Sequence, residues 1–208
     1  MKRPVKRVVF YLGVALLVVA GVMAGRDLMA PKGWQVDVPS SRTQGAALIG
    51  GPFTLVDHTG KAVTEADFRG RFMFVFFGFT YCPDACPTAL TTMAEALDII
   101  GPAADRIVPV LISIDPERDT PEQLAMYVRH FHPSLVGLTG SADQVAAAAK
   151  AFRVYYAKAK EEGSDEGDYT MDHTSIIYLM GPDGKFRVHF SGHATSPEDL
   201  AKGILDVL

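Results

Sequence analysis

The sequence predicts an α/β sandwich, a mixed β-sheet flanked by helices, preceded by an N-terminal transmembrane helix. Two apolar runs, at 72–79 and 107–114, have the length and composition of strands that are buried on both faces. Each run is followed by a stretch with apolar residues at helical spacing, and such alternation is typical of parallel strands joined by helices. A third apolar run, at 8–25, carries no charge and precedes the rest of the chain.

The segment 1–26 is predicted to be a membrane anchor. The 18 uncharged residues from Val8 to Gly25 would span about 27 Å as a helix, close to the hydrocarbon thickness of a bilayer. Because the basic residues before this run should stay cytoplasmic, we expect a single pass through the inner membrane, with the C-terminal domain in the periplasm or an equivalent exported compartment. A signal peptide cleaved near Val22–Ala24 is the alternative.

The remainder of the chain divides into a linker at 27–50, which is rich in Pro, Gly and Ser, and a folded domain at 51–208. Beyond residue 26 the chain holds 15 basic and 24 acidic groups, a net charge of −9. This balance offers no basic patch for a nucleic acid. A cationic protein partner or a metal ion suits it better.

The first half of the domain is expected to alternate strands and helices. Pro87 suits the first turn of a helix, and Gly101-Pro102 would end that helix. The turn at 57–60 predicts a short hairpin before it. The expected elements are strands at 53–56 and 62–63, a helical turn at 64–68, a buried strand at 72–79, a helix at 87–100 and a second buried strand at 107–114.

The second half is marked by capping boxes and a tight turn. Thr120 with Gln123, and Ser141 with Gln144, are typical of helix starts. The turn at 181–184 predicts an antiparallel hairpin. The expected elements are a helix opening at 120, a short strand at 135–138, a helix at 141–152, an extended stretch at 153–157, a charged loop at 161–168, strands at 175–180 and 186–190, and a last helix at 196–205.

Both cysteines lie in the turn between the strand 72–79 and the following helix. A helix N-terminus favours the thiolate, so both Cys82 and Cys86 are expected to have lowered pKa values and to be redox-active thiols. A purely structural disulfide is disfavoured, because a loop of three intervening residues removes little entropy from the unfolded chain. A cysteine pair between the first central strand and the helix that follows it is the arrangement found in thioredoxin. In the thioredoxin motif, however, only two residues separate the cysteines, whereas three do here. The pair could form a disulfide or bind a soft metal.

Two cysteines do not complete a metal site, and a histidine is the natural third ligand. His173, just before the strand at 175–180, is the best candidate, with His193 as the alternative. Two thiolates with an imidazole form a ligand set suited to copper. The remaining four histidines are interpreted as structural or surface residues: His58, His130, His132 and His189. Arg118 and Asp119, in the loop after the second buried strand, could touch a partner near the metal face.

Four motifs, at 80–88, 113–121, 172–174 and 181–184, together resemble the Sco/SenC family of copper proteins, and the resemblance extends from about Gly51 to the C-terminus. It implies a thioredoxin-like domain that binds one copper ion, as Cu(I) or Cu(II). The implied ligands are Cys82, Cys86 and His173, with Asp172 beside them as a supporting residue that does not bind the metal.

The resemblance also implies a role in assembling the copper A site in subunit II of cytochrome c oxidase. The protein would deliver copper to that site, reduce its cysteines, or do both. Other copper chaperones or thioredoxin-like reductants are the further partners implied. The alternative is a thiol–disulfide oxidoreductase of the thioredoxin superfamily without an obligatory metal. A peroxidase supported by Arg118, and a copper or redox sensor, are weaker alternatives.

Overall fold

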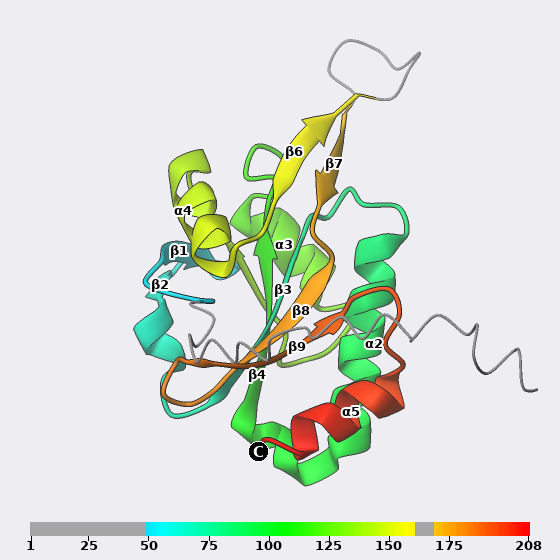
Figure 1. Ribbon diagram of the computed structural model, residues 1–208. Helices are drawn as coiled ribbons and strands as arrows, with labels where there is room; N and C mark the ends of the chain where they lie inside the picture. Colours follow the sequence, from blue (N-terminus) through cyan, green and yellow to red (C-terminus); the bar gives the residue numbers. More distant parts are fainter. Residues whose placement is uncertain (1–48, 161–168) are drawn as a thin grey trace, which may run out of the picture. The chain divides into compact units, whose positions relative to one another are not determined.

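The computed structural model describes residues 49–160 and 169–208 (Figure 1). The expected anchor at 1–26, the linker up to residue 48 and the charged loop 161–168 lie outside these residues. These described residues belong to one compact unit. Within the described ranges, no helix combines the length and the apolar character needed to cross a membrane.

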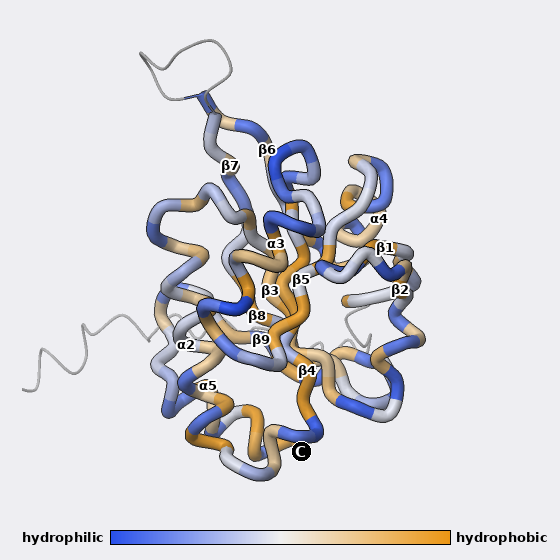
Figure 2. Tube along the Cα trace, turned by 180° about the vertical axis from the view of Figure 1, so that it is seen from behind, coloured by the Kyte–Doolittle hydropathy of each residue, from blue (hydrophilic) through white to orange (hydrophobic). Residues whose placement is uncertain are grey.

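A mixed sheet of seven strands, in the order β2-β1-β5-β4-β3-β8-β9, forms the centre of this unit. The central strands β3 (Phe72–Gly78) and β4 (Ile107–Ser113) are parallel, and β5 (Val136–Thr139) is parallel to β4. Every residue of β3 and β4 is buried, as their apolar sequences predict. Figure 2 shows this apolar centre as the hydrophobic strands inside a more polar shell.

The sheet becomes antiparallel at both edges. On one side β8 (Ile176–Met180) pairs antiparallel with β3, and β9 (Phe186–Ser191) pairs antiparallel with β8. On the other side β1 (Thr54–Asp57) pairs antiparallel with both β5 and β2 (Ala62–Thr64). The predicted parallel centre and antiparallel hairpins are confirmed.

Helices flank the sheet. The helix α2 packs against α5 and follows β3, while α3 contacts β5 and α4 contacts β1. Thr120, Ser141 and Ser196 each accept a hydrogen bond from a backbone N–H in the first turn of the helix that follows, so their predicted capping is confirmed. The helical segments are η1 (Glu65–Phe68), α2 (Ala85–Ile100), η2 (Gly101–Arg106), α3 (Pro121–Val128), α4 (Ala142–Phe152) and α5 (Pro197–Leu205).

Two local features differ from the sequence prediction. The helix α2 begins at Ala85 instead of Pro87, because proline is tolerated throughout the first turn, where N–H groups have no helical partner. Cys86 therefore lies inside the helix. A hairpin of β6 (Tyr156–Ala159) and β7 (Thr170–His173) forms a separate two-stranded sheet that projects from the main one (Figure 1). The polar sequence of β7 gave no strand signal.

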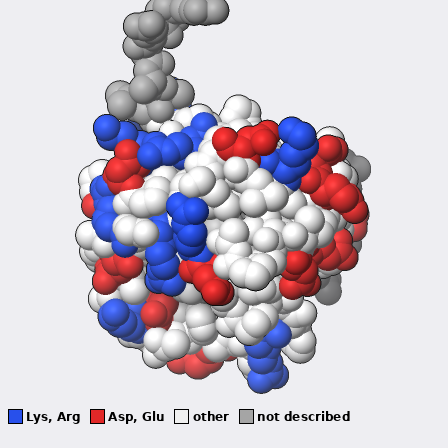
Figure 3. Space-filling model, turned by 90° about the horizontal axis from the view of Figure 1, so that it is seen from below, with Lys and Arg blue, Asp and Glu red and all other residues white. Residues whose placement is uncertain are grey.

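Figure 3 shows the face of the molecule seen from below, where basic and acidic side chains lie side by side. Elsewhere among the described residues, Arg187 pairs with Asp183 and Lys202 with Asp206. Pairs of this kind are exposed and contribute little to stability.

Candidate metal centre

The turn that carries the cysteines is anchored to the loop after β4 by a buried carboxylate. Asp119 is fully buried and accepts hydrogen bonds from the Thr80 hydroxyl (2.6 Å), the Thr80 backbone N–H (3.1 Å) and the Ser113 hydroxyl (2.6 Å). Burial raises the pKa of Asp119, against the lowering effect of these donors. Because its side chain is enclosed, the expectation that Asp119 touches a partner is wrong, and its role is to hold the turn.

The two thiols differ sharply in environment. Cys82 is partly exposed and Cys86 is buried, and the two are not joined by a disulfide. A hydrogen bond from the Cys86 side chain lowers the pKa of Cys82 to about 5, and the backbone N–H of Cys86, 3.3 Å from Cys82 Sγ, adds to this shift. The same hydrogen bond between the two side chains, together with burial, raises the pKa of Cys86. The predicted lowering is therefore confirmed for Cys82 and wrong for Cys86, where pairing and burial outweigh the helix N-terminus.

Gly78, the last residue of β3, leaves space for the Cys86 sulfur. A Cβ atom at this position would lie 2.9 Å from Cys86 Sγ and 2.9 Å from the Phe76 ring. Any larger residue would displace the thiol from the end of the sheet. The sequence shows a glycine here, but the need for close approach becomes visible only in the folded chain.

His173 is brought to the cysteines by the unpredicted strand β7. Its Nε2 atom lies 3.8 Å from Cys86 Sγ, and its Nδ1 atom lies 3.1 Å from the carbonyl oxygen of Thr174. An Nδ1–H that donates to this carbonyl leaves the Nε2 lone pair directed at the sulfur. The imidazole packs edge-on against Phe76 and Phe79, and burial lowers the pKa of His173, which favours the neutral ring.

The donor set fits a soft metal ion. With bonds of about 2.3 Å to sulfur and about 2.0–2.1 Å to nitrogen, a sulfur and a nitrogen that bind one ion at tetrahedral or trigonal angles would stand roughly 3.5–3.8 Å apart. The Cys86–His173 separation of 3.8 Å lies at the upper end of this range. The cage is not yet closed: among the described residues no three His, Cys, Asp or Glu side chains are already grouped as metal ligands. Binding through Cys86 would require the Cys86 thiol to lose its proton, since the thiolate is the metal ligand.

The other candidate residues lie at or near the surface. Asp172 is exposed next to His173, and its charge has only a small raising effect on the His173 pKa. His193 is exposed, and its charge opposes protonation of His173. His58 Nδ1 accepts a hydrogen bond from the Gly137 N–H, and His132 Nδ1 contacts the Ser134 hydroxyl.

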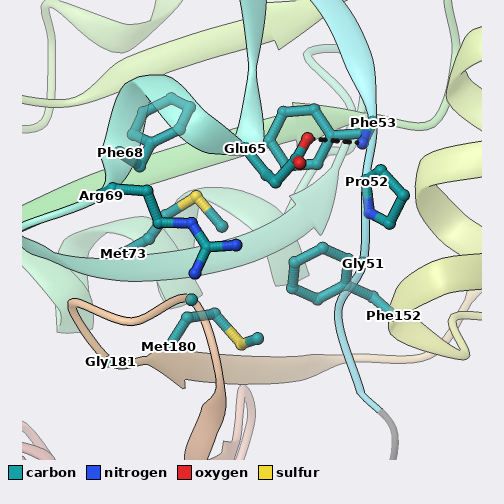
Figure 4. A pocket seen from close by; sticks show the side chains of 11 residues that line it. Gly51, Pro52, Phe53, Glu65, Phe68, Arg69, Met73, Phe152, Met180 and Gly181 are labelled. Carbon is teal, nitrogen blue, oxygen red and sulfur yellow. Dashed lines mark hydrogen bonds between the residues drawn. The ribbon is translucent and has the colours of Figure 1, made fainter.

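A cavity of about 150 Å³ lies near the end of β3 that is opposite to the cysteine turn, where Met73 pairs with Met180. Neither the cysteines nor His173 line this cavity. Phe53, Phe68 and Phe152 line it, with the Arg69 guanidinium at its wall (Figure 4). The cysteine turn, in contrast, lies at a surface next to Tyr81, whose side chain is 58% exposed. An exposed position of this kind suits exchange with another protein better than capture of a small molecule.

Comparison with known proteins identifies the family. The SCO1/SenC family model matches residues 41–208. The chain belongs to the SCO1/SenC family. It is 44% identical over 163 residues to Protein sco1 of Schizosaccharomyces pombe, with 78% of this chain and 62% of that protein covered. It is 42% identical over 196 residues to the mitochondrial SCO1 homologue of Homo sapiens, with 93% and 63% covered. The chain thus spans about three-fifths of the length of these two relatives.

Solved structures of family members confirm the thioredoxin-like fold. Copper-bound ScoI of Arabidopsis thaliana has a TM-score of 0.71 and 43% identity, and the match covers 76% of this chain and 96% of that one. Copper-bound ScoI of Bradyrhizobium japonicum has a TM-score of 0.70 and 44% identity, with 77% and 99% covered. BsSco, described as a cytochrome c oxidase assembly protein with a disulfide switch, has a TM-score of 0.58 and 25% identity, with 76% and 92% covered.

Proposed function

We propose that this chain is a membrane-tethered copper chaperone that delivers copper to the copper A site of cytochrome c oxidase subunit II, reduces the cysteines of that site, or does both. The observation that carries the proposal is the approach of His173 Nε2 to Cys86 Sγ at 3.8 Å, beside a second cysteine. The copper-bound relatives and the assembly role described for BsSco support it.

Copper would be held by Cys82, Cys86 and His173, one ion per domain. Two thiolates favour Cu(I), and the imidazole adds a donor that Cu(II) prefers, so the same site can hold both states. The ligands are unequally accessible: Cys82 is partly exposed while Cys86 is enclosed. Thiolates of a partner would therefore reach the cargo from the Cys82 side, which gives the transfer a direction.

Copper binding by three single variants tests the ligand set. We expect Cys82→Ser and Cys86→Ser to abolish tight binding of Cu(I), and His173→Ala to weaken Cu(II) more than Cu(I), because two thiolates remain for the softer ion. The wild-type full chain should show a thiolate-to-Cu(II) charge-transfer absorption. Undiminished tight binding in any one variant would remove that residue from the site.

The tether is the second part of the proposal. Segment 1–26 would anchor the chain in the inner membrane with its N-terminus in the cytoplasm, 27–50 would act as a linker, and 51–208 would be the exported copper-binding domain. Membrane fractionation with N-terminal sequencing of the mature protein tests this arrangement. A soluble product that starts near Gly25 would contradict it.

A thiol–disulfide oxidoreductase is the second candidate function, and the unequal thiols favour it. Cys82, with its pKa lowered to about 5, would attack a target disulfide, form a mixed disulfide and release one target thiolate. Cys86, after losing its proton, would attack Cys82 and release the second target thiolate. The chain would then carry a Cys82–Cys86 disulfide, and the target would have gained two electrons.

His173 distinguishes the two candidates, since disulfide exchange does not require it. If a His173→Ala chain supports oxidase assembly in cells as well as the wild type does, the reductase function accounts for the activity. If that variant fails while the chain still reduces the target disulfide in vitro, copper delivery is the essential function.

A further inference from the structure

The aromatic ring of Tyr169 contacts two cations. The Arg118 guanidinium carbon lies 3.7 Å from the ring centroid, and Lys158 Nζ lies 4.4 Å from it. Each cation also forms an ion pair with a carboxylate of the loop that follows β4. Arg118, itself in this loop, pairs with Asp115, and Lys158 of β6 pairs with Glu117. The hairpin of β6 and β7 is thus attached to this loop at Tyr169.

Directional hydrogen bonds reinforce this attachment. Arg118 Nη1 donates to the Tyr169 backbone carbonyl at 2.9 Å, and the Tyr169 hydroxyl donates to Asp115 Oδ1 at 2.8 Å. Asp115 is 1% exposed, so its bonds to both partners are shielded from water. The Lys158–Glu117 pair is exposed and contributes much less. Arg118 is therefore the stronger of the two attachments.

Arg118 also reaches the cysteine turn. Its guanidinium lies 4.7 Å from the centroid of the Tyr81 ring and 5.9 Å from that of Phe79. Tyr81 directly precedes Cys82, and the Phe79 ring packs edge-on against His173, with the ring centroids 6.2 Å apart. One side chain therefore contacts both the segment that carries the cysteines and the hairpin that carries the histidine.

The hairpin depends on such contacts for its position. Among the described residues, its two strands pair only with each other, and a lone two-stranded hairpin is marginally stable in water. His173 is the last residue of β7, four positions after Tyr169. Where Tyr169 is held therefore contributes to where the imidazole stands relative to the two sulfurs, together with the packing of the ring against Phe76 and Phe79.

We propose that Arg118 is a positioning residue that holds Tyr169, and through it His173, in register with Cys82 and Cys86. This inference rests on the proposed copper site. Loss of Arg118 should therefore weaken the binding of Cu(II) more than that of Cu(I). Cu(II) uses the imidazole, whereas two thiolates are enough to hold Cu(I). Arg118 therefore adjusts the preference of the site between the two oxidation states without touching the ion.

The test compares Arg118→Met in the full chain with Arg187→Met, which removes an arginine from an ion pair with Asp183 on the edge hairpin. We expect Arg118→Met to lower Cu(II) affinity by roughly 10–100-fold, the usual cost of losing a group that orients a ligand, and Cu(I) affinity by a smaller factor. The Cu(II) affinity of Arg118→Lys should lie between those of the wild type and Arg118→Met, because lysine keeps the positive charge but not the planar guanidinium group. Arg187→Met should leave both affinities unchanged.

A double-mutant cycle identifies the route of the effect. In a His173→Ala background, Arg118→Met should cause no further loss of Cu(II) affinity, because the imidazole it positions is already absent. An equal loss of both copper states, or a further loss in the His173→Ala background, would overturn the proposal. If the wild type bound no copper, or if His173→Ala bound copper as tightly as the wild type, the proposed function would fail independently of Arg118.

A readout without copper completes the test. In the metal-free wild type, nuclear Overhauser contacts should join the ring protons of Phe79 and His173; they should be lost in Arg118→Met and kept in Arg187→Met. Persistence of these contacts in Arg118→Met would refute the positioning role whatever the copper data show. If Arg118→Met does not fold, Tyr169→Leu removes the stacked ring while leaving the Arg118–Asp115 pair, and the same criteria apply.

Discussion

The Thr80 hydroxyl donates a hydrogen bond of 2.6 Å to Asp119, a fully buried carboxylate 39 positions away in the sequence. The bond joins the cysteine turn to the loop after β4, so these two segments form one supporting structure behind the metal centre. Its strength can be measured, because Asp119 has no other role in the proposed site.

Replacing Asp119 by alanine should destabilise the domain. The change leaves the Thr80 N–H and hydroxyl and the Ser113 hydroxyl without their acceptor, and an unsatisfied buried group costs about 1–3 kcal/mol. Denaturant unfolding of the reduced, metal-free chain measures the loss. Asp119→Asn, which keeps one acceptor oxygen, should lose less, and equal losses in the two variants would argue against the hydrogen bonds as the cause.

Alkylation of the reduced chain by iodoacetamide should occur at Cys82 and persist in mildly acid solution. Because the Cys86 side chain lowers the pKa of Cys82 to about 5, the thiolate is present at pH values where an ordinary cysteine is protonated. The pH profile of the rate should have its midpoint near 5. Cys86→Ala removes the hydrogen-bond donor and should move the midpoint upward; an unchanged midpoint would assign the shift to the helix N-terminus alone.

The stability of the reduced, metal-free chain should rise with pH between about 7 and 9. In this window the folded chain carries Cys82 as a thiolate, whereas the unfolded chain, with a cysteine pKa near 9.0, still binds the proton. The unfolded state therefore holds more protons, and the free energy of unfolding increases with pH. The Cys82 contribution is lost as the pH falls through about 5. Cys82→Ser should flatten the slope, and denaturant midpoints across this range provide the measurement.

Gly78→Ala should disturb the metal centre through packing alone. The added methyl group would meet Cys86 Sγ and the Phe76 ring at 2.9 Å, and overpacking of a core usually costs about 1–3 kcal/mol. We expect lower stability and weaker copper binding, measured on the same preparation. Gly51→Ala is the matched control, because its Cβ would meet only Ala151 Cβ at an ordinary 3.5 Å. Similar effects in both variants would show that the position of Cys86 is not the cause.

Much of this architecture follows from the sequence, since the central strands are continuous apolar runs and the helices carry clear caps. The sequence also singles out the cysteine turn and His173, because ligand-type residues are rare and the motifs around them are distinctive, and the structure brings Cys86 and His173 together. The sequence did not predict β7, whose four residues Thr170–His173 are mostly polar and pair only with β6. It also missed the high pKa of Cys86, which depends on burial and on pairing with Cys82.

The attachment at Tyr169 could not be predicted for a related reason. Arg118 and Tyr169 are 51 positions apart, and neither belongs to a periodic pattern that would indicate a contact. Similarly, the three donors to Asp119 come from two segments that meet only after the sheet has formed. Such contacts arise from tertiary structure, while sequence patterns report mainly on local structure and on which faces are buried.

The separation of the ligands along the chain also has a consequence for biosynthesis. Cys86 and His173 are 87 positions apart, so a ribosome adding about 5–20 residues per second needs roughly 4–17 s to make the histidine after the second cysteine. During that interval the nascent chain has two neighbouring thiols but lacks His173, the third proposed ligand. Premature oxidation would trap it before the site exists, so newly made chains should depend on a reducing partner before they can receive their first metal ion.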